Sequence, residues 1–392
     1  MSLHQTVEFA KKAGLISGAT LAGLIVLFIV IRVGIVIKNI MYPPKTVPPN
    51  QAYGQLPPIQ FPTSEYTTPF SYKINTLTGE LPEFPARVNV YPIKQYEPNF
   101  LNLDKAKAKA ISLRFIRDTG SILPERRIGE VMYEWSETTG QLRRVLKFNI
   151  LTFDFTMTSN YLSSLTVLNA QHISDQANAI STARDFLTTV NLLPSDIDFD
   201  KTQNPNKEMH FITGPQLFSI QNSALIPTTS LSKTRVFRVN LYQKDISYDL
   251  DTGVPGAAKV PLTLPMLYPK PPYSTMSFWV ASGPSAPEVV ATNYYHKDII
   301  FPAEGEPVAT YPIKTTKEAF EELQNGMGYV AAYDGTDSEI LINNVTLGYY
   351  LGEGAQEYLT PVIAFEGDKG FFAYVSAIKE GETPTAEETP AQ

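Results

Sequence analysis

Residues 311–333, YPIKTTKEAFEELQNGMGYVAAY, place a short amphipathic helix directly in front of a strand. Thr315 and Glu318 have the spacing of a capping box, in which each side chain binds the backbone at the other residue. Phe320 and Leu323 fall on one face at helical spacing, and the Asn-Gly that follows is a typical helix stop. Such a helix, followed by strands that short turns connect, predicts an α+β fold with antiparallel sheet.

The same arrangement occurs twice earlier in the chain. Residues 104–118, DKAKAKAISLRFIRD, and 174–194, SDQANAISTARDFLTTVNLLP, both have an apolar stripe at helical spacing and are followed by strand patterns. The inward-facing residues are predicted to be Ala106, Ala110, Leu113 and Ile116 in the first helix, and Ala177, Ile180, Ala183, Leu187 and Val190 in the second, which Ser174 caps. We therefore predict three modules, residues 86–172, 173–312 and 313–379, each a helix packed on a curved antiparallel sheet.

A hydrophobic run near the start predicts a helix that crosses a membrane once. From Gly14 to Ile37 the only strongly polar residue is Arg32, and 24 helical residues span the roughly 30 Å of a bilayer core. We expect Arg32 to reach the headgroup region, the alternative being a contact with an acidic residue of a partner helix. No small-residue cleavage site follows, which disfavours a signal peptide. The predicted arrangement is a cytoplasmic head at residues 1–13, a transmembrane helix at 14–38 in the lipid bilayer, and an extracytoplasmic body.

Three further segments stand out by composition. Residues 39–85 are rich in proline, with three Pro-Pro pairs between residues 42 and 63. Proline disfavours helix, so this segment is either an extended stalk or an irregular strap that lies on the first module. Residues 254–274 form a Pro-rich insertion in the middle module, which we expect to be a surface loop. Residues 380–392 are acidic and lack aromatic residues, which predicts a disordered tail.

The composition excludes several classes of function. The net charge is −7 and the chain has no basic block, which argues against nucleic acid as a partner. The chain has no cysteine, which excludes disulfide bonds, a thiol nucleophile and a zinc–thiolate site.

No pattern in the sequence is typical of catalysis or of a cofactor. The four histidines, His4, His172, His210 and His296, lack the spacing of a metal-binding motif. His296 and Asp298 share one face of a strand, but two ligands do not make a zinc site. Asp249–Gly253, DLDTG, resembles the start of a calcium loop but lacks its later glycine and glutamate, so a turn is the simpler interpretation. We therefore predict no catalytic residue, no cofactor and no metal site. A hydrolase that uses two unrecognised carboxylates is left open.

Two further patterns bear on binding. Asn344 begins a formal glycosylation triplet, but it lies inside a predicted strand. Three pairs of adjacent aromatic residues occur in predicted strands, where neighbours point to opposite faces. One ring of each pair is predicted to pack under a helix, and the other either packs across strands or contributes to a surface for peptides or glycans. The pairs are Tyr294 and Tyr295, Tyr349 and Tyr350, and Phe371 and Phe372.

The segments YPIKTTKEAFEELQNGMGYVAAY, VTLGYYL and YLTPVIAFEGDKGFFAYVSAI together resemble the YycI/YycH-like and PepSY-type extracytoplasmic proteins. The resemblance is clearest over residues 311–379 and weaker over residues 173–312, where QANAISTARDFLTTVNLLP is similar to a PepSY-type helix. It implies tandem cystatin-like folds after an N-terminal anchor, and a non-enzymatic role in which the protein binds and restrains a sensor kinase or a secreted enzyme. The Pro-rich segment and the middle insertion depart from the pattern, so no specific partner follows.

These observations predict a single-pass membrane protein of the cell envelope whose extracytoplasmic modules bind or regulate another membrane or secreted protein. The alternative is a structural or glycan-binding envelope protein, with residues 39–85 as a spacer.

Overall fold

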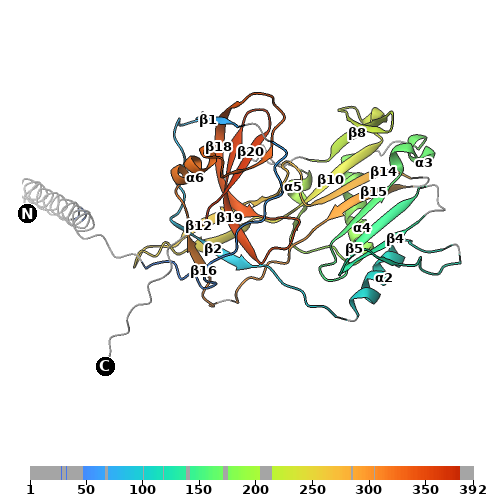
Figure 1. Ribbon diagram of the computed structural model, residues 1–392, viewed down its shortest axis with the longest axis horizontal. Coiled ribbons are helices and arrows are strands. Elements are labelled where there is room, and N and C mark those ends of the chain that lie inside the picture. Colours follow the sequence, from blue (N-terminus) through green and yellow to red (C-terminus); the bar gives the residue numbers. More distant parts are fainter. Residues whose placement is uncertain are drawn as a thin grey trace, which may run out of the picture. The chain divides into compact units, whose positions relative to one another are not determined.

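The computed structural model describes residues 47–379 except 67–68, 100, 118, 138–141, 171–174, 204–213, 284–285 and 304, together with Phe28 and Arg32 (Figure 1). The chain divides into two compact units, one of Pro49–Leu250 with Pro261–Gln392 and one of Met1–Pro48 with Asp251–Val260. The larger unit holds two large sheets.

The first sheet has eight strands and is built mainly from the C-terminal third of the chain. Its central order is β1-β18-β19-β2-β16; β20 also pairs with β19, β17 pairs with β20, and β13 pairs with β18. The strands are β1 (Ser71–Ile74), β2 (Arg87–Pro92), β13 (Met266–Leu267), β16 (Ala309–Pro312), β17 (Tyr329–Ala332), β18 (Glu339–Tyr350), β19 (Tyr358–Gly367) and β20 (Phe371–Ser376). β1 and β13 run parallel to β18, and the helix α6 (Thr316–Gln324) packs on β20.

The second sheet has ten strands, all paired in antiparallel fashion. Its order is β3-β4-β5-β6-β15-β14-β10-β8-β9, and β7 also pairs with β10. The strands are β3 (Arg126–Arg127), β4 (Met132–Ser136), β5 (Arg144–Asn149), β6 (Phe155–Ser159), β7 (Ile197–Asp198), β8 (Gln216–Gln221), β9 (Ala224–Pro227), β10 (Val236–Gln243), β14 (Met276–Ser282) and β15 (Pro287–Tyr294). The smaller elements are β11 (Ile246–Leu250) paired with β12 (Val260–Leu264), the helices α3 (Leu165–Leu168) and α5 (Phe199–Gln203), and the 3₁₀ turns η1 (Tyr161–Ser163) and η2 (Leu231–Lys233).

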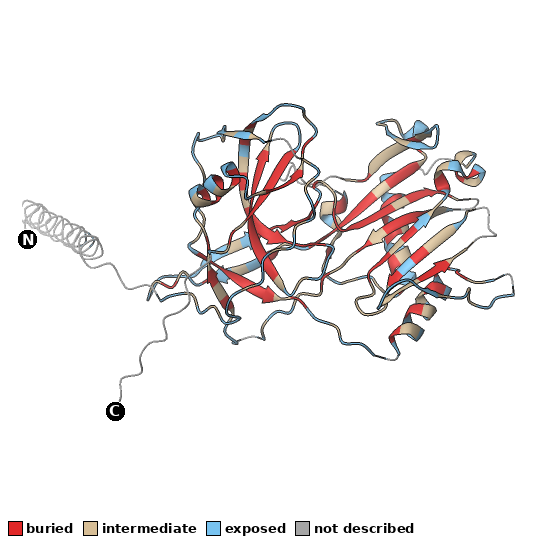
Figure 2. Ribbon diagram, in the orientation of Figure 1, coloured by how far each residue is buried: buried red, intermediate tan, exposed pale blue. Residues whose placement is uncertain are grey.

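Two helices cover one face of the ten-stranded sheet. α4 (Gln176–Thr189) packs on β10, β14 and β15, and α2 (Asn102–Ser112) belongs to the same apolar core. Alternate residues of β10, namely Phe237, Val239 and Leu241, point into this core and are fully buried. The intervening residues therefore lie on the opposite face of the sheet. Figure 2 shows the buried residues along the central strands of both sheets.

The three predicted helices are present, but the first, α2, ends at Ser112, so the predicted inward-facing Ile116 lies beyond the helix in a bridge with Ile122 and Phe115 is buried instead. The capping box of Thr315 and Glu318 is complete at α6. At α4 the cap is Asp175, whose side chain accepts a hydrogen bond from the Asn178 amide. Ala177 is exposed and Ala179 is buried in its place, because Ala179 lies one helical turn before Ala183 on the buried face.

Residues 49–85 form a strap on the eight-stranded sheet, and not on the first predicted module. Strand β1 adds to the sheet beside β18, and seven aromatic or aliphatic residues pack against the core of this sheet. They are Ile59, Phe61, Tyr66, Phe70, Tyr72, Leu81 and Phe84. The insertion at residues 254–274 also differs from its prediction as a surface loop. Leu264, Met266, Leu267 and Tyr268 are buried, because β13 pairs with β18.

The predicted fold class, a transmembrane helix followed by tandem cystatin-like modules, is wrong. Strands between residues 126 and 159 and strands between residues 216 and 294 join one sheet, so α2 and α4 share a sheet and do not have one each. The eight-stranded sheet likewise takes strands from residues 71–92 and 266–312. The hydrophobic pattern determines which residues form strands and which face of each strand is buried. It does not determine which strands pair with one another.

The transmembrane helix predicted at residues 14–38 lies outside the described residues, apart from Phe28 and Arg32, as do the head at 1–13 and the tail at 380–392. Within the described part of the chain, no helix is long and apolar enough to cross a membrane.

Candidate functional site

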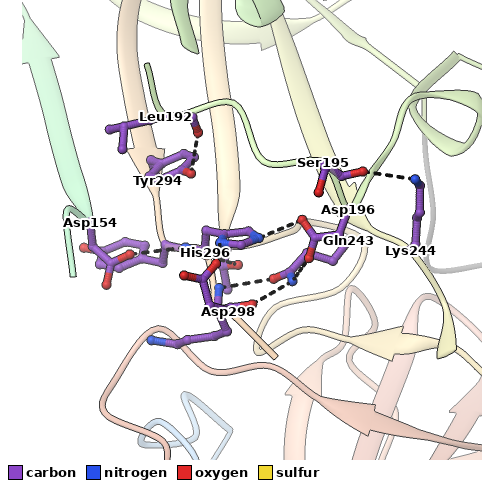
Figure 3. A network of polar contacts seen from close by, with 12 residues as sticks. Asp154, Leu192, Ser195, Asp196, Gln243, Lys244, Tyr294, His296 and Asp298 are labelled. Carbon is purple, nitrogen blue, oxygen red and sulfur yellow. Dashed lines mark hydrogen bonds and ion pairs between the residues drawn. The ribbon is translucent and has the colours of Figure 1, made fainter. Parts of the chain in front are cut away.

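The predicted pair His296 and Asp298 does come together, at the end of β15 (Figure 3). The His296 Nδ1 atom lies 3.3 Å from Asp298 Oδ1, and its Nε2 atom lies 2.8 Å from Asp196 Oδ1. Tyr96 donates its hydroxyl hydrogen to the other oxygen of Asp298. The imidazole is thus held between two carboxylates. Sequence reasoning missed Asp196 because it is 100 residues away and no local pattern connects the two.

The charges of this cluster argue against His296 as a general base or a metal ligand. Burial opposes its positive charge, but hydrogen bonds to Asp196 and Asp298 outweigh burial and raise the pKa of His296 to about 9. The hydrogen bond from His296 lowers the pKa of Asp298 to about 2. At neutral pH the ring is therefore an imidazolium, which has no lone pair to accept a proton or to bind a metal. No group of three or more His, Asp or Glu side chains in the described part of the chain is arranged to hold a metal ion.

The groups around His296 find their partners within the chain. The His296 amide donates to Asp154 Oδ1 at 3.2 Å, and Gln243 donates to Asp196 Oδ2 at 2.7 Å. Lys297 donates to the carbonyl oxygen of Gly354, in the turn between β18 and β19, at 2.9 Å. The cluster therefore connects the end of β15 to a turn of the other sheet and presents no vacant ligand position.

The other predicted candidates do not form a site. Gly253 donates its amide to Asp251 Oδ1 at 2.8 Å, so the DLDTG stretch is a turn. Five of the six paired aromatic rings are buried and only Tyr295 is partly exposed, which confirms cross-strand packing and removes the basis for a glycan surface there. Asn344 is partly buried in β18 and donates to Glu366. His4, His172 and His210 lie outside the described residues.

A groove beside β17 is the better candidate. β17 follows α6 and pairs on one side with β20; no strand pairs with its other side within the described part of the chain. The groove has a volume of about 320 Å³. It is lined by residues from β17, by strap residues Thr63, Glu65 and Tyr66, and by the loop of residues 270–273.

Side chains of the strap bind the backbone of β17 and of Tyr333, the residue that follows it. The Tyr66 hydroxyl accepts a hydrogen bond from the Tyr333 amide at 2.8 Å and donates one to the Tyr333 carbonyl oxygen at 3.1 Å. The Ser64 hydroxyl donates to the Val330 carbonyl oxygen at 3.2 Å. These backbone groups are thus turned away from β20 and toward the strap. They are the groups that an added strand would bind.

The rest of the groove supplies apolar surface and charged side chains. Phe372 and Tyr329 contribute aromatic rings, and burial raises the pKa of Tyr329 to about 12, so its hydroxyl stays neutral. Lys270 forms an exposed ion pair with Glu65 at 2.8 Å, and Asp334 lies beside Gly370. No side chain here is paired with a base that could activate it as a nucleophile. The arrangement is suited to binding.

Comparison with known proteins adds little to this geometry. No family model matches the sequence, and no curated protein matches it. Among solved structures, the chain is similar to an uncharacterized protein from Eubacterium rectale ATCC 33656, with 10% sequence identity, 76% of this chain and 86% of that chain covered, and a TM-score of 0.30. A TM-score this low carries no argument about fold or function. The resemblance to the YycI/YycH-like and PepSY-type proteins stays a prediction.

Proposed function

We propose that this protein binds an extended segment of another protein, which lies in the groove as an additional strand beside β17. The proposed role is binding, through which the chain regulates the bound partner, and no reaction is assigned to the chain. One observation carries the proposal: the outer backbone groups of β17 are bound by side chains and not by a strand. Strand addition at an open sheet edge is a common way to bind peptides, because backbone hydrogen bonds give affinity and adjacent pockets select side chains.

A selection experiment tests this function directly. The full-length protein is used to enrich a phage-displayed library of short random peptides, and the enriched peptides are synthesised. We expect peptides with alternating apolar residues that bind with a measurable affinity. Methylation of backbone nitrogens at every second residue should abolish binding, and methylation of the intervening nitrogens should not, because only alternate amides of an added strand face β17. Enriched peptides whose binding tolerates methylation at all positions would contradict the proposal, as would a lack of enrichment.

The strap provides a matched pair of variants. Tyr66→Phe removes the hydroxyl that competes for the Tyr333 backbone, so the peptide affinity should rise about 3- to 10-fold. Tyr311 makes the same pair of hydrogen bonds at the other side of the sheet: its hydroxyl accepts from the Tyr53 amide at 2.9 Å and donates to the Gly54 carbonyl oxygen at 3.0 Å. Tyr311→Phe should leave peptide affinity unchanged, since it does not line the groove.

A further inference from the structure

Arg238 is a partly buried cation that has no carboxylate partner within the described part of the chain. It lies on β10, on the face of the ten-stranded sheet opposite the core under α4. Two other half-buried cations have such a partner: Arg144 pairs with Glu137 at 2.8 Å and Lys314 pairs with Glu322 at 2.7 Å. Burial lowers the pKa of Arg238, which shows that its surroundings disfavour the charge. A buried charge without a counter-ion is unusual in a folded protein.

Two aromatic rings fix the position of the guanidinium group. Its central carbon lies 3.5 Å from the centre of the Tyr273 ring and 4.9 Å from that of Trp279. Trp279 is the cross-strand partner of Arg238 on β14. Rings stacked on a guanidinium cover its faces and leave the N–H groups in its plane for hydrogen bonds. One of these groups, on Nη2, donates to the Ser277 hydroxyl at 3.2 Å.

Three buried polar atoms around Arg238 have no hydrogen-bond partner within the described residues. They are Arg238 Nε, Asn240 Nδ2 and Gln216 Oε1. Gln216 is the cross-strand partner of Arg238 on β8, and Asn240 is two residues further along β10, so all three side chains share one face of the sheet. Buried polar groups are nearly always paired, so the two unpaired donors, Arg238 Nε and Asn240 Nδ2, mark a site that an additional acceptor completes.

We propose that Arg238 and Asn240 bind a carboxylate group of the segment that occupies the groove. The inference rests on the proposed function. It deepens that function because Tyr273, whose ring covers Arg238, also lines the groove. A carboxylate fits better than a phosphate, since it is planar and its two oxygens match adjacent N–H groups of a guanidinium that is held between two rings. The carboxylate belongs either to the C-terminus of the bound segment or to an aspartate or glutamate side chain.

A titration with sodium acetate tests the carboxylate site without any peptide. In the full-length protein with ¹⁵N-labelled arginine, the Nε–H resonance of Arg238, assigned with the variant Arg238→Lys, should shift saturably with acetate. It should not shift with sodium chloride at the same ionic strength. The Nε–H resonance of Arg144, which already donates to Glu137 at 2.8 Å, is the internal control and should stay in place. An Arg238 resonance that does not respond to acetate would overturn the inference.

Peptides from the selection described above identify the source of the carboxylate. Each is made as the free acid, as the C-terminal amide, and with its glutamates and aspartates changed to glutamine and asparagine. Arg238→Met should weaken binding of the carboxylate-bearing form about 10- to 100-fold and leave the matching neutral form unaffected. Lys147→Met, which removes a charge from the same face of this sheet, is the control and should change nothing.

The outcomes separate the two proposals. If Arg238→Met binds every peptide as well as the unmodified protein does, the carboxylate inference fails and the proposed function stands. If no peptide is enriched, the proposed function fails, and the acetate titration alone decides whether Arg238 binds a carboxylate.

Discussion

The two large sheets protect their edges in different ways. In the eight-stranded sheet, the strap of residues 49–85 contributes β1, places Asn50 and Gln51 on the backbone of β16, and binds the backbone of β17 through side chains. The ten-stranded sheet ends instead in short strands, with two exposed arginines in β3 and with Pro227 in β9. Charge, proline and short length prevent further pairing at an edge, whereas a cover of side chains can be displaced. The comparison therefore indicates that β17 is the edge from which the covering side chains can be displaced, so that another strand can pair with it.

The largest effect on stability is expected at Phe61, which packs the strap against the eight-stranded sheet. Phe61 stacks on Tyr329 with ring centres 5.0 Å apart and meets Tyr350 edge-on at 4.9 Å. Phe61→Ala should lower the free energy of unfolding by about 2–4 kcal/mol, because it removes apolar burial and two ring contacts. The change is measured by urea denaturation.

Leu225→Ala is the control at the edge of the ten-stranded sheet, where Leu225 is only partly buried in β9. It should lower the free energy of unfolding by about 1 kcal/mol or less. Equal effects of the two substitutions would contradict the idea that the strap stabilises its sheet more than the edge strand β9 stabilises the ten-stranded sheet.

The next effect concerns the cluster around His296, which links the two sheets. The pKa of His296 in the folded protein, about 9, lies above the 6.5 of a free histidine side chain, so the stabilisation is fully present below pH 6.5 and is lost as the pH rises through about 9. The loss should amount to about 2–3 kcal/mol between those limits. Urea midpoints of the unmodified protein at several pH values measure it. His296→Gln should show a flatter profile over this range, and a profile as steep as that of the unmodified protein would exclude His296 as its cause.

A smaller effect is expected where the strap covers β17. Tyr66→Phe removes two hydrogen bonds to Tyr333 and should lower the free energy of unfolding by about 1 kcal/mol. Tyr311→Phe should have a similar effect, because its hydroxyl also makes two backbone hydrogen bonds. Hydrogen exchange distinguishes the two variants: only Tyr66→Phe should speed the exchange of the Tyr333 amide.

The smallest effect is expected at β1. Lys73 and Glu339 form an ion pair at 2.7 Å, but their side chains are 64% and 53% exposed. Lys73→Ala should therefore change the free energy of unfolding by about 0.5 kcal/mol or less. A much larger loss on thermal or urea denaturation would mean that this pair, and not the packing of Phe61, holds the strap in place.

Local features of the sequence were predictable and distant ones were not. The capping box of α6 involves residues three apart, and the aromatic pairs of β18 and β20 are adjacent within each strand. Both features can therefore be predicted from the sequence. The sequence leaves open whether residues 39–85 form a stalk or a strap, because the contact of Tyr66 with Tyr333 joins residues 267 apart. His296 was singled out, yet its partner Asp196 was not. The strand with Arg238 was predicted, but its missing counter-ion depends on which residues of β8 and β14 lie beside it.

The pairing of β1 with β18 has a consequence for how the chain is made. The Ser71 hydroxyl donates to the carbonyl oxygen of Ser338, which is 267 residues later. At a synthesis rate of about 5–20 residues per second, the strap emerges from the ribosome roughly 15 to 50 seconds before the strand that receives it. Its aromatic side chains have no partner during that interval. A nascent chain stalled before β18 should therefore be a client of chaperones that hold exposed apolar segments, and release of the finished C-terminal strands should end that dependence.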